Sequence, residues 1–176
     1  METVDIEILK YPIGKFNYNE YDLEAKNNFI ETISSFPNKI IEITKDLTDS
    51  QLETPYRPGS WTIRQVVHHC ADSHMNAFIR YKLALTEEKP TVKAYEEQLW
   101  AVQPDYKLPL TASLNIIAGL HARWVALLNS MAAADFEAKY IHPQTGKELD
   151  LKFKLPLYAW HCEHHLAHIR QALAKN

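Results

Sequence analysis

The chain has 176 residues, of which 46% are hydrophobic and 23% charged, and its formal net charge is -3 at pH 7. These values are typical of one soluble domain that is large enough to bury an apolar core. No basic run or stripe is present, which argues against nucleic acid or an anionic membrane as a partner. No apolar stretch reaches about 18 residues, so no transmembrane helix is expected.

The first half of the chain predicts two long helices within a single domain over residues 1–176. An N-terminal arm over residues 1–19 precedes a helical pattern over residues 19–47, which Pro37 is expected to kink or divide. Thr62 and Gln65 then match a capping box, in which each side chain satisfies a backbone donor of the first turn. A long helix is therefore expected from this box to about residue 86.

The second half predicts two further helices and a small hairpin. The expected elements are a long crossover over 87–110, a helix over 112–131 capped by Thr111, a hairpin over 139–153 with its turn at Pro143–Gly146, and a last helix over 156–174 with Pro156 in its first turn. Four long amphipathic helices joined by long connections predict an all-α fold, a four-helix bundle with crossover connections. Such bundles build metal sites from side chains on facing helices.

The two cysteines predict a reducing compartment. Cys70 and Cys162 lie in predicted helices far apart in sequence, and the N-terminal segment is acidic where a secretory signal would be basic. We therefore expect a cytoplasmic protein whose two thiols are free. Both cysteines are interpreted as small core residues.

Four histidines in ten residues mark the last predicted helix, and helical geometry separates them into two pairs. His161/His165 and His164/His168 each have the i, i+4 spacing that places two rings on one face. Only the first pair borders the apolar face of this helix, so the second pair is expected to point outward. Two imidazoles at this spacing can bind one ion but need a third ligand from another helix.

The second predicted helix offers three candidates for that ligand. His69 lies at the edge of the apolar face, beside a polar stripe, whereas His68 lies far from it. His74 also points inward, and helical geometry alone does not separate it from His69. A lone buried histidine is usually a hydrogen-bonded core residue, so His74, like His121 and His142, is interpreted as structural or surface.

Several motifs together resemble one family. The segments are WTIRQVVHHCADSHMNAFIRYKLALTEEKP (61–90), HARW (121–124), YIHP (140–143) and YAWHCEHHLAHI (158–169), with shorter matches at YPIG (11–14) and DSQLETPYRPG (49–59). Together they resemble the YfiT branch of the DinB-like superfamily of four-helix bundles. The resemblance covers nearly the whole chain and implies that fold, with a homodimer as the expected assembly.

The resemblance also implies a three-histidine site for a divalent metal. One family ligand stands eight residues after the tryptophan that opens the second helix, and the other two form an i, i+4 pair in the last helix. Carried over by motif, these are His69 (eight after Trp61), His161 and His165. His164 falls where this branch also carries histidine and is expected to be peripheral.

Three neutral imidazoles would leave the ion its full charge and open coordination positions, as in a catalytic site. Zinc is the expected ion, and nickel also binds imidazole. The family resemblance implies either of two activities, transfer of a low-molecular-weight thiol such as bacillithiol to an electrophile, or hydrolysis by metal-bound hydroxide. A non-enzymatic bundle that binds a metal or a small ligand is the third alternative.

Asp72 is a candidate catalytic residue, and Arg80 is a candidate for binding the carboxylate of an anionic thiol.

Overall fold

The computed structural model describes residues 6–142 and 146–174. Its long helices are α2 (Leu23–Thr44), α4 (Ile63–Thr86), α6 (Thr111–Ser130) and α7 (Leu151–Leu173). Its short elements are α1 (Ile6–Lys10), α3 (Asp49–Leu52), α5 (Glu97–Trp100), two 3-10 turns (Pro104–Lys107 and Ala133–Glu137), and strands β1 (Lys139–Ile141) and β2 (Glu148–Asp150).

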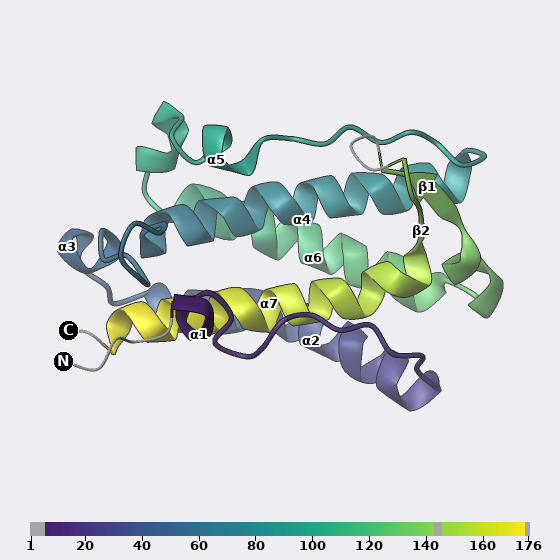
Figure 1. The fold of residues 1–176 in the computed structure, drawn as a ribbon, viewed down its shortest axis with the longest axis horizontal. Helices are drawn as coiled ribbons and strands as arrows, with labels where there is room; N and C mark the ends of the chain where they lie inside the picture. Colours follow the sequence, from purple (N-terminus) through teal and green to yellow (C-terminus); the bar gives the residue numbers. More distant parts are fainter. Residues whose placement is uncertain (1–5, 143–145, 175–176) are drawn as a thin grey trace.

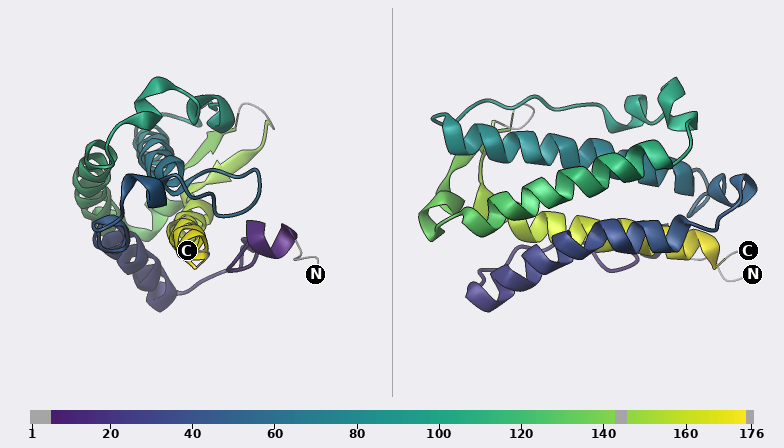
Figure 2. Two further views of the ribbon diagram at one scale, coloured as in Figure 1. Left: turned by 90° about the vertical axis from the view of Figure 1, so that its left-hand side faces the viewer. Right: turned by 180° about the vertical axis from the view of Figure 1, so that it is seen from behind.

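The four long helices form the predicted bundle. α2 packs against α6 and α7, and α4 packs against the same two helices. The connection between α4 and α6 runs back along the length of α4 (Figure 1), so that α4 and α6 point the same way and α7 runs opposite to both. The end-on view in Figure 2 shows the four helices around one core, with the N-terminal arm lying against the outside of α7.

Local capping fixes where most of the long helices begin. The predicted capping box is present, with the Thr62 N–H donating to the Gln65 side chain at 3.0 Å and the Gln65 N–H donating to Thr62 Oγ1 at 3.3 Å. The predicted cap at Thr111 is wrong. The helix begins at Thr111 itself, because the buried Leu110 is already helical and its carbonyl accepts from the Leu114 N–H.

Both prolines in long helices lie inside them, which excludes a division of the first helix at Pro37 and corrects the predicted start of the last helix at Pro156. Pro37 does not divide α2, and Pro156 lies in the second turn of α7, which begins at Leu151 behind the cap of Asp150. A proline leaves the carbonyl four residues earlier without its helical donor. Here a distant side chain supplies each missing donor: Tyr21 Oη donates to the Lys152 carbonyl at 2.9 Å, and a ring nitrogen of His121 lies 2.7 Å from the Ile33 carbonyl.

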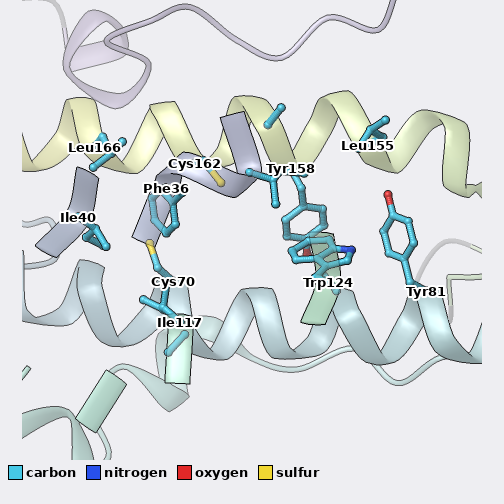
Figure 3. Close-up of a cluster of buried hydrophobic side chains, with 14 of the residues drawn as sticks. Phe36, Ile40, Cys70, Tyr81, Ile117, Trp124, Leu155, Tyr158, Cys162 and Leu166 are labelled. Carbon is cyan, nitrogen blue, oxygen red and sulfur yellow. The ribbon is translucent and has the colours of Figure 1, made fainter. Parts of the chain in front are cut away.

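The core lies between the four long helices. Figure 3 shows Cys70 and Cys162 among its apolar side chains, and both are free thiols with no exposed surface, as predicted. The predicted hairpin is present, with Tyr140 opposite Leu149, and its first strand also bridges to the crossover through Thr91 and Ile141. Most of its predicted turn, residues 143–145, lies outside the described residues.

One described helix, α6, is long and apolar enough by composition to cross a membrane. It packs against α2 and α4 as a member of the bundle, with Ile117, Trp124 and Leu128 fully buried. These three apolar side chains therefore belong to the core of the bundle.

Candidate metal centre

Three histidine rings converge between α4 and α7. The centroid of the His69 ring lies 5.5 Å from that of His161 and 4.9 Å from that of His165, and the latter two lie 4.4 Å apart. One ring nitrogen from each lies within 4.8 Å of the other two. Among the described residues, no other group of three or more His, Cys, Asp or Glu side chains meets this condition. The arrangement fits one metal ion with three nitrogen ligands.

The three rings are neutral at physiological pH, which is the form that binds a metal. Burial, followed by neighbouring histidines, lowers the pKa of His161 and His165 well below the usual value. Burial lowers the pKa of His69 to about 4. His69 Nδ1 is buried and has no hydrogen-bond partner within the described part of the chain, so this ring carries an unsatisfied nitrogen.

The two rings on α7 are each held by another histidine. His161 Nδ1 lies 3.0 Å from Nε2 of His74 on α4. His165 Nδ1 lies 3.5 Å from Nδ1 of His168, whose Nε2 donates to the carbonyl of Lys10 in the N-terminal arm at 3.0 Å. Metal-binding histidines commonly make such a contact through the ring nitrogen that does not bind the ion.

The N-terminal arm changes the expected role of the second histidine pair. His164 and His168 were predicted to point outward, but they are 7% and 2% exposed. The arm covers this side of α7: Tyr11 stacks on His164, and the Lys10 carbonyl accepts from His168. The helical pattern of α7 identified the inward pair, whereas the cover over the other pair comes from a segment about 150 residues away.

A pocket of about 350 Å³ opens onto the histidines. Besides His69, His161 and His165, its lining includes His164, His168, Trp61, Trp160, Tyr11, Tyr56, Lys10, Arg57, Glu97 and Gln98. It is thus a polar, aromatic-walled pocket, suited to a small polar ligand.

Arg57 contributes a positive charge to the wall of this pocket. It follows α3 in a turn in which Pro58 precedes Gly59, whose φ of +70° suits glycine. Its guanidinium lies over the Tyr56 ring at 5.5 Å and donates to the Pro58 carbonyl through Nη1. Its Nε is buried without a hydrogen-bond partner, and no carboxylate pairs with it among the described residues. The turn therefore presents an uncompensated positive charge to the pocket.

A carboxylate and a second cation also line this pocket. Glu97 comes from α5 in the crossover, and desolvation by surrounding protein atoms raises the pKa of its carboxyl, against the effect of nearby Arg80. Lys10 pairs with Glu7 at 2.9 Å. Sequence patterns did not single out Arg57 or Glu97 as site residues, because connecting segments without a periodic pattern bring them to the site. Arg57 does lie within the family match at residues 49–59, which was the one signal for it.

Asp72 and Arg80 do not line the histidine pocket. Asp72 accepts a 2.6 Å hydrogen bond from Tyr106 Oη and lines a separate cavity beneath the crossover. Arg80 donates to the Lys93 carbonyl at 3.2 Å. The proposed roles of these two residues stay predictions, and the structure brings neither to the three histidines.

The cysteines offer no exposed nucleophile. Burial raises the pKa of both Cys70 and Cys162, which keeps the thiols protonated. Glu163, next to Cys162 in sequence, pairs with Lys39 of α2 at 2.7 Å and lies outside the histidine pocket. A second, carboxylate-rich metal position is therefore absent from the lining of this pocket.

Comparison with known proteins places the chain in a family. Residues 33–169 match the model of the DinB superfamily, so the chain belongs to that superfamily. The chain is similar to a solved structure from Bacillus subtilis described as "YfiT … a probable metal-dependent hydrolase with an unusual four-helix bundle topology", with a TM-score of 0.92 and 42% identity over 96% of this chain and 97% of that one.

Sequence relatives support the same assignment. A Bacillus cereus protein named "Putative metal-dependent hydrolase" is 51% identical over 162 residues, which cover 92% of this chain and 93% of the relative. A Bacillus thuringiensis protein of the same description is also 51% identical over 162 residues. The predicted family resemblance and the predicted four-helix bundle are thereby confirmed. The histidine cluster fits the metal dependence in the names of these relatives.

Proposed function

We propose that this chain binds one divalent metal ion through His69, His161 and His165 and transfers a low-molecular-weight, anionic thiol to an electrophile. Zinc is the expected ion and nickel the second choice, because both bind imidazole well. Three protein ligands leave positions open for a substrate, and a divalent ion there would stabilise the substrate thiol as thiolate.

The observation that carries the proposal is the pairing of neutral histidines with an uncompensated cation in one pocket. Arg57 lines the same pocket as the three histidines and has no carboxylate partner in the described part of the chain. Guanidinium binds carboxylates through two parallel hydrogen bonds. A thiol that carries a carboxylate, such as bacillithiol, could therefore place its acidic group on Arg57 and its sulfur near the histidines.

The buried cysteines support a small-molecule nucleophile. Since Cys70 and Cys162 are both inaccessible and protonated, the sulfur that attacks the electrophile has to come from a bound thiol. In the proposed reaction a carbon–sulfur bond forms, the bond from carbon to the leaving group breaks, and the thiol proton passes to solvent. Small thiols of this kind are cytoplasmic reductants, so we propose the cytoplasm as the site of action, with a homodimer as the working assembly.

The test is a conjugation assay with metal-loaded protein and a chloro-aromatic electrophile. Bacillithiol, glutathione and cysteine are the acidic thiols, and 2-mercaptoethanol is the neutral control. We expect conjugation above background with at least one acidic thiol, its loss in His161→Ala, and an increase in KM of about tenfold or more for that thiol in Arg57→Gln. Rates at background with every thiol would exclude the transferase.

Hydrolysis is the second candidate, and Glu97 is the observation that favours it. Its carboxyl lines the histidine pocket, where it could act as a general base, and desolvation raises its pKa above the ordinary value for a glutamate. Glu97→Gln is expected to abolish hydrolysis of ester and amide substrates and to leave thiol conjugation within a few-fold of wild type. Stoichiometric metal binding without either activity would favour the third alternative, a metal-binding or ligand-binding protein.

A further inference from the structure

A continuous chain of three histidine rings crosses the core from the candidate metal centre to α2. His161 Nδ1 lies 3.0 Å from His74 Nε2, and His74 Nδ1 lies 2.7 Å from Nε2 of His121 on α6. His121 Nδ1 in turn lies 2.7 Å from the carbonyl of Ile33 on α2. Three different helices supply the rings, and the fourth helix supplies the last acceptor.

The Ile33 carbonyl, where this series of histidine rings ends, lacks its usual helical donor because of Pro37. A helical residue at position 37 would normally donate its N–H to the Ile33 carbonyl, four residues earlier, but proline has no N–H. His121 is the donor that replaces it. The proline in α2 and the histidine in α6 thus form one structural unit, although His121 lies 88 residues from the carbonyl of Ile33 in sequence.

The Ile33 carbonyl determines which ring nitrogen carries the proton in each of the three histidines. A carbonyl only accepts, so the proton of neutral His121 is on Nδ1, and its Nε2 accepts from His74. Neutral His74 then carries its proton on Nδ1 and accepts at Nε2 from His161 Nδ1–H. The one remaining nitrogen, Nε2 of His161, is unprotonated, and its lone pair faces the hydroxyl of Ser73 at 3.4 Å, a long contact that a metal ion would replace.

The surroundings keep these rings neutral and in place. His74 and His121 are 0% and 1% exposed. Phe36 packs on both rings, at centroid distances of 5.1 Å and 5.4 Å, and Trp124 packs against both from α6. No carboxylate is hydrogen bonded or ion paired to either ring within the described residues, so no neighbouring charge favours an imidazolium.

We infer that His74 and His121 are positioning residues, which hold His161 as an Nε2 ligand through a proton arrangement fixed by the Ile33 carbonyl. The inference rests on the metal site of the proposed function and is independent of which reaction follows. His74 does not bind the ion. It takes the place that a carboxylate or a backbone carbonyl takes behind most metal-binding histidines.

The test compares three variants by a chelator competition titration with Zn²⁺ and Ni²⁺. His121→Phe removes both hydrogen bonds, and we expect metal affinity to fall about 10-fold to 100-fold. His121→Gln keeps a donor for Ile33 and an acceptor for His74, so we expect affinity within about threefold of wild type. Leu128→Ala, a fully buried change two turns further along α6, serves as the control for lost stability. It should lower the melting temperature with little effect on affinity.

Nitrogen-15 NMR of the metal-free wild type reports the proton positions directly. We expect protonated Nδ1 and unprotonated Nε2 in His161, His74 and His121. Wild-type affinity in His121→Phe, or a different proton arrangement in the wild-type rings, would overturn the inference. Loss of conjugation activity with these results intact would overturn only the proposed reaction, and full metal binding by His161→Ala would overturn the site itself.

Discussion

The two histidines that α7 contributes to the candidate metal centre are supported in contrasting ways. Behind His161, two further rings lead through the core to a carbonyl of α2, with contacts of 2.7–3.0 Å. Behind His165, one ring leads outward to a carbonyl of the N-terminal arm, and its first contact is 3.5 Å long. The first support is part of the bundle, whereas the second depends on a segment that docks on its outside.

This difference indicates how the bundle positions the candidate ligands. Core helices fix His161 through contacts of 2.7–3.0 Å within the bundle. The arm fixes His165 through a longer contact, and the same arm contributes Lys10 and Tyr11 to the pocket wall. A change in the arm should therefore alter the position of His165 more than that of His161.

The largest expected effect is a pH dependence of the free energy of unfolding that comes from His121, the buried histidine behind His161 and His74. Burial lowers the pKa of His121 from 6.5 to about 4. Below pH 6.5 His121 is protonated in the unfolded chain but stays neutral in the folded chain. Its contribution to stability is therefore complete above pH 6.5 and is lost progressively as the pH falls to about 4. The total loss from this residue is about 3 kcal/mol, of which about 2 kcal/mol falls between pH 7 and pH 5.

Urea unfolding of metal-free protein at pH 7 and pH 5 measures this effect. His121→Gln removes the titrating group, so its stability difference between the two pH values should be smaller than that of wild type by about 2 kcal/mol. An equal difference in the two proteins would show that His121 is not held neutral in the core.

The second largest effect is the loss of metal affinity when the histidine that contacts each ligand on α7 is replaced, His74 behind His161 and His168 behind His165. His74→Phe leaves the Nδ1–H of His161 without its acceptor, and we expect metal affinity to fall about 10-fold to 100-fold. His168→Phe removes the longer contact to His165 and should cost less than about tenfold, because a 3.5 Å contact is a weak hydrogen bond. Competition titrations with Zn²⁺ rank the two variants, and the reverse order would contradict the comparison.

The smallest effect tests the arm itself. Tyr11→Ala removes the ring that stacks on His164 and loosens the arm next to Lys10. We expect metal affinity to fall by only about two- to fivefold, within the range of a modest packing loss. Proteolysis near the arm should become faster in this variant, and the nitrogen-15 signals of His74 and His121 should be unchanged. A shift in those two signals would show that the supports are not separate.

Helical periodicity was sufficient for the four long helices and for the inward pair His161/His165. It did not separate His69 from His74, and the family resemblance selected the histidine that converges with this pair. The capping box at Thr62 was likewise predictable from local sequence, at the level of single hydrogen bonds.

Long-range contacts account for what was missed. Pro37 and Pro156 are tolerated inside helices because His121 and Tyr21 supply distant donors, which no local rule reveals.

Residues from irregular segments were beyond prediction for the same reason. Arg57 reaches the pocket from a turn, Glu97 from the crossover, and the cover over His164 from the arm. Their positions depend on how the connections fold back onto the bundle. Asp72, chosen because it lies near His69 on α4, instead accepts from Tyr106 beneath the crossover.

His69, His161 and His165 are proposed to hold one divalent ion per chain. The most direct test is the metal content of purified protein after loading with Zn²⁺ and exhaustive dialysis, measured by elemental analysis alongside His69→Ala and His161→Ala. We expect about one ion per chain in wild type and close to none in either variant. Full metal content in both variants would contradict the account.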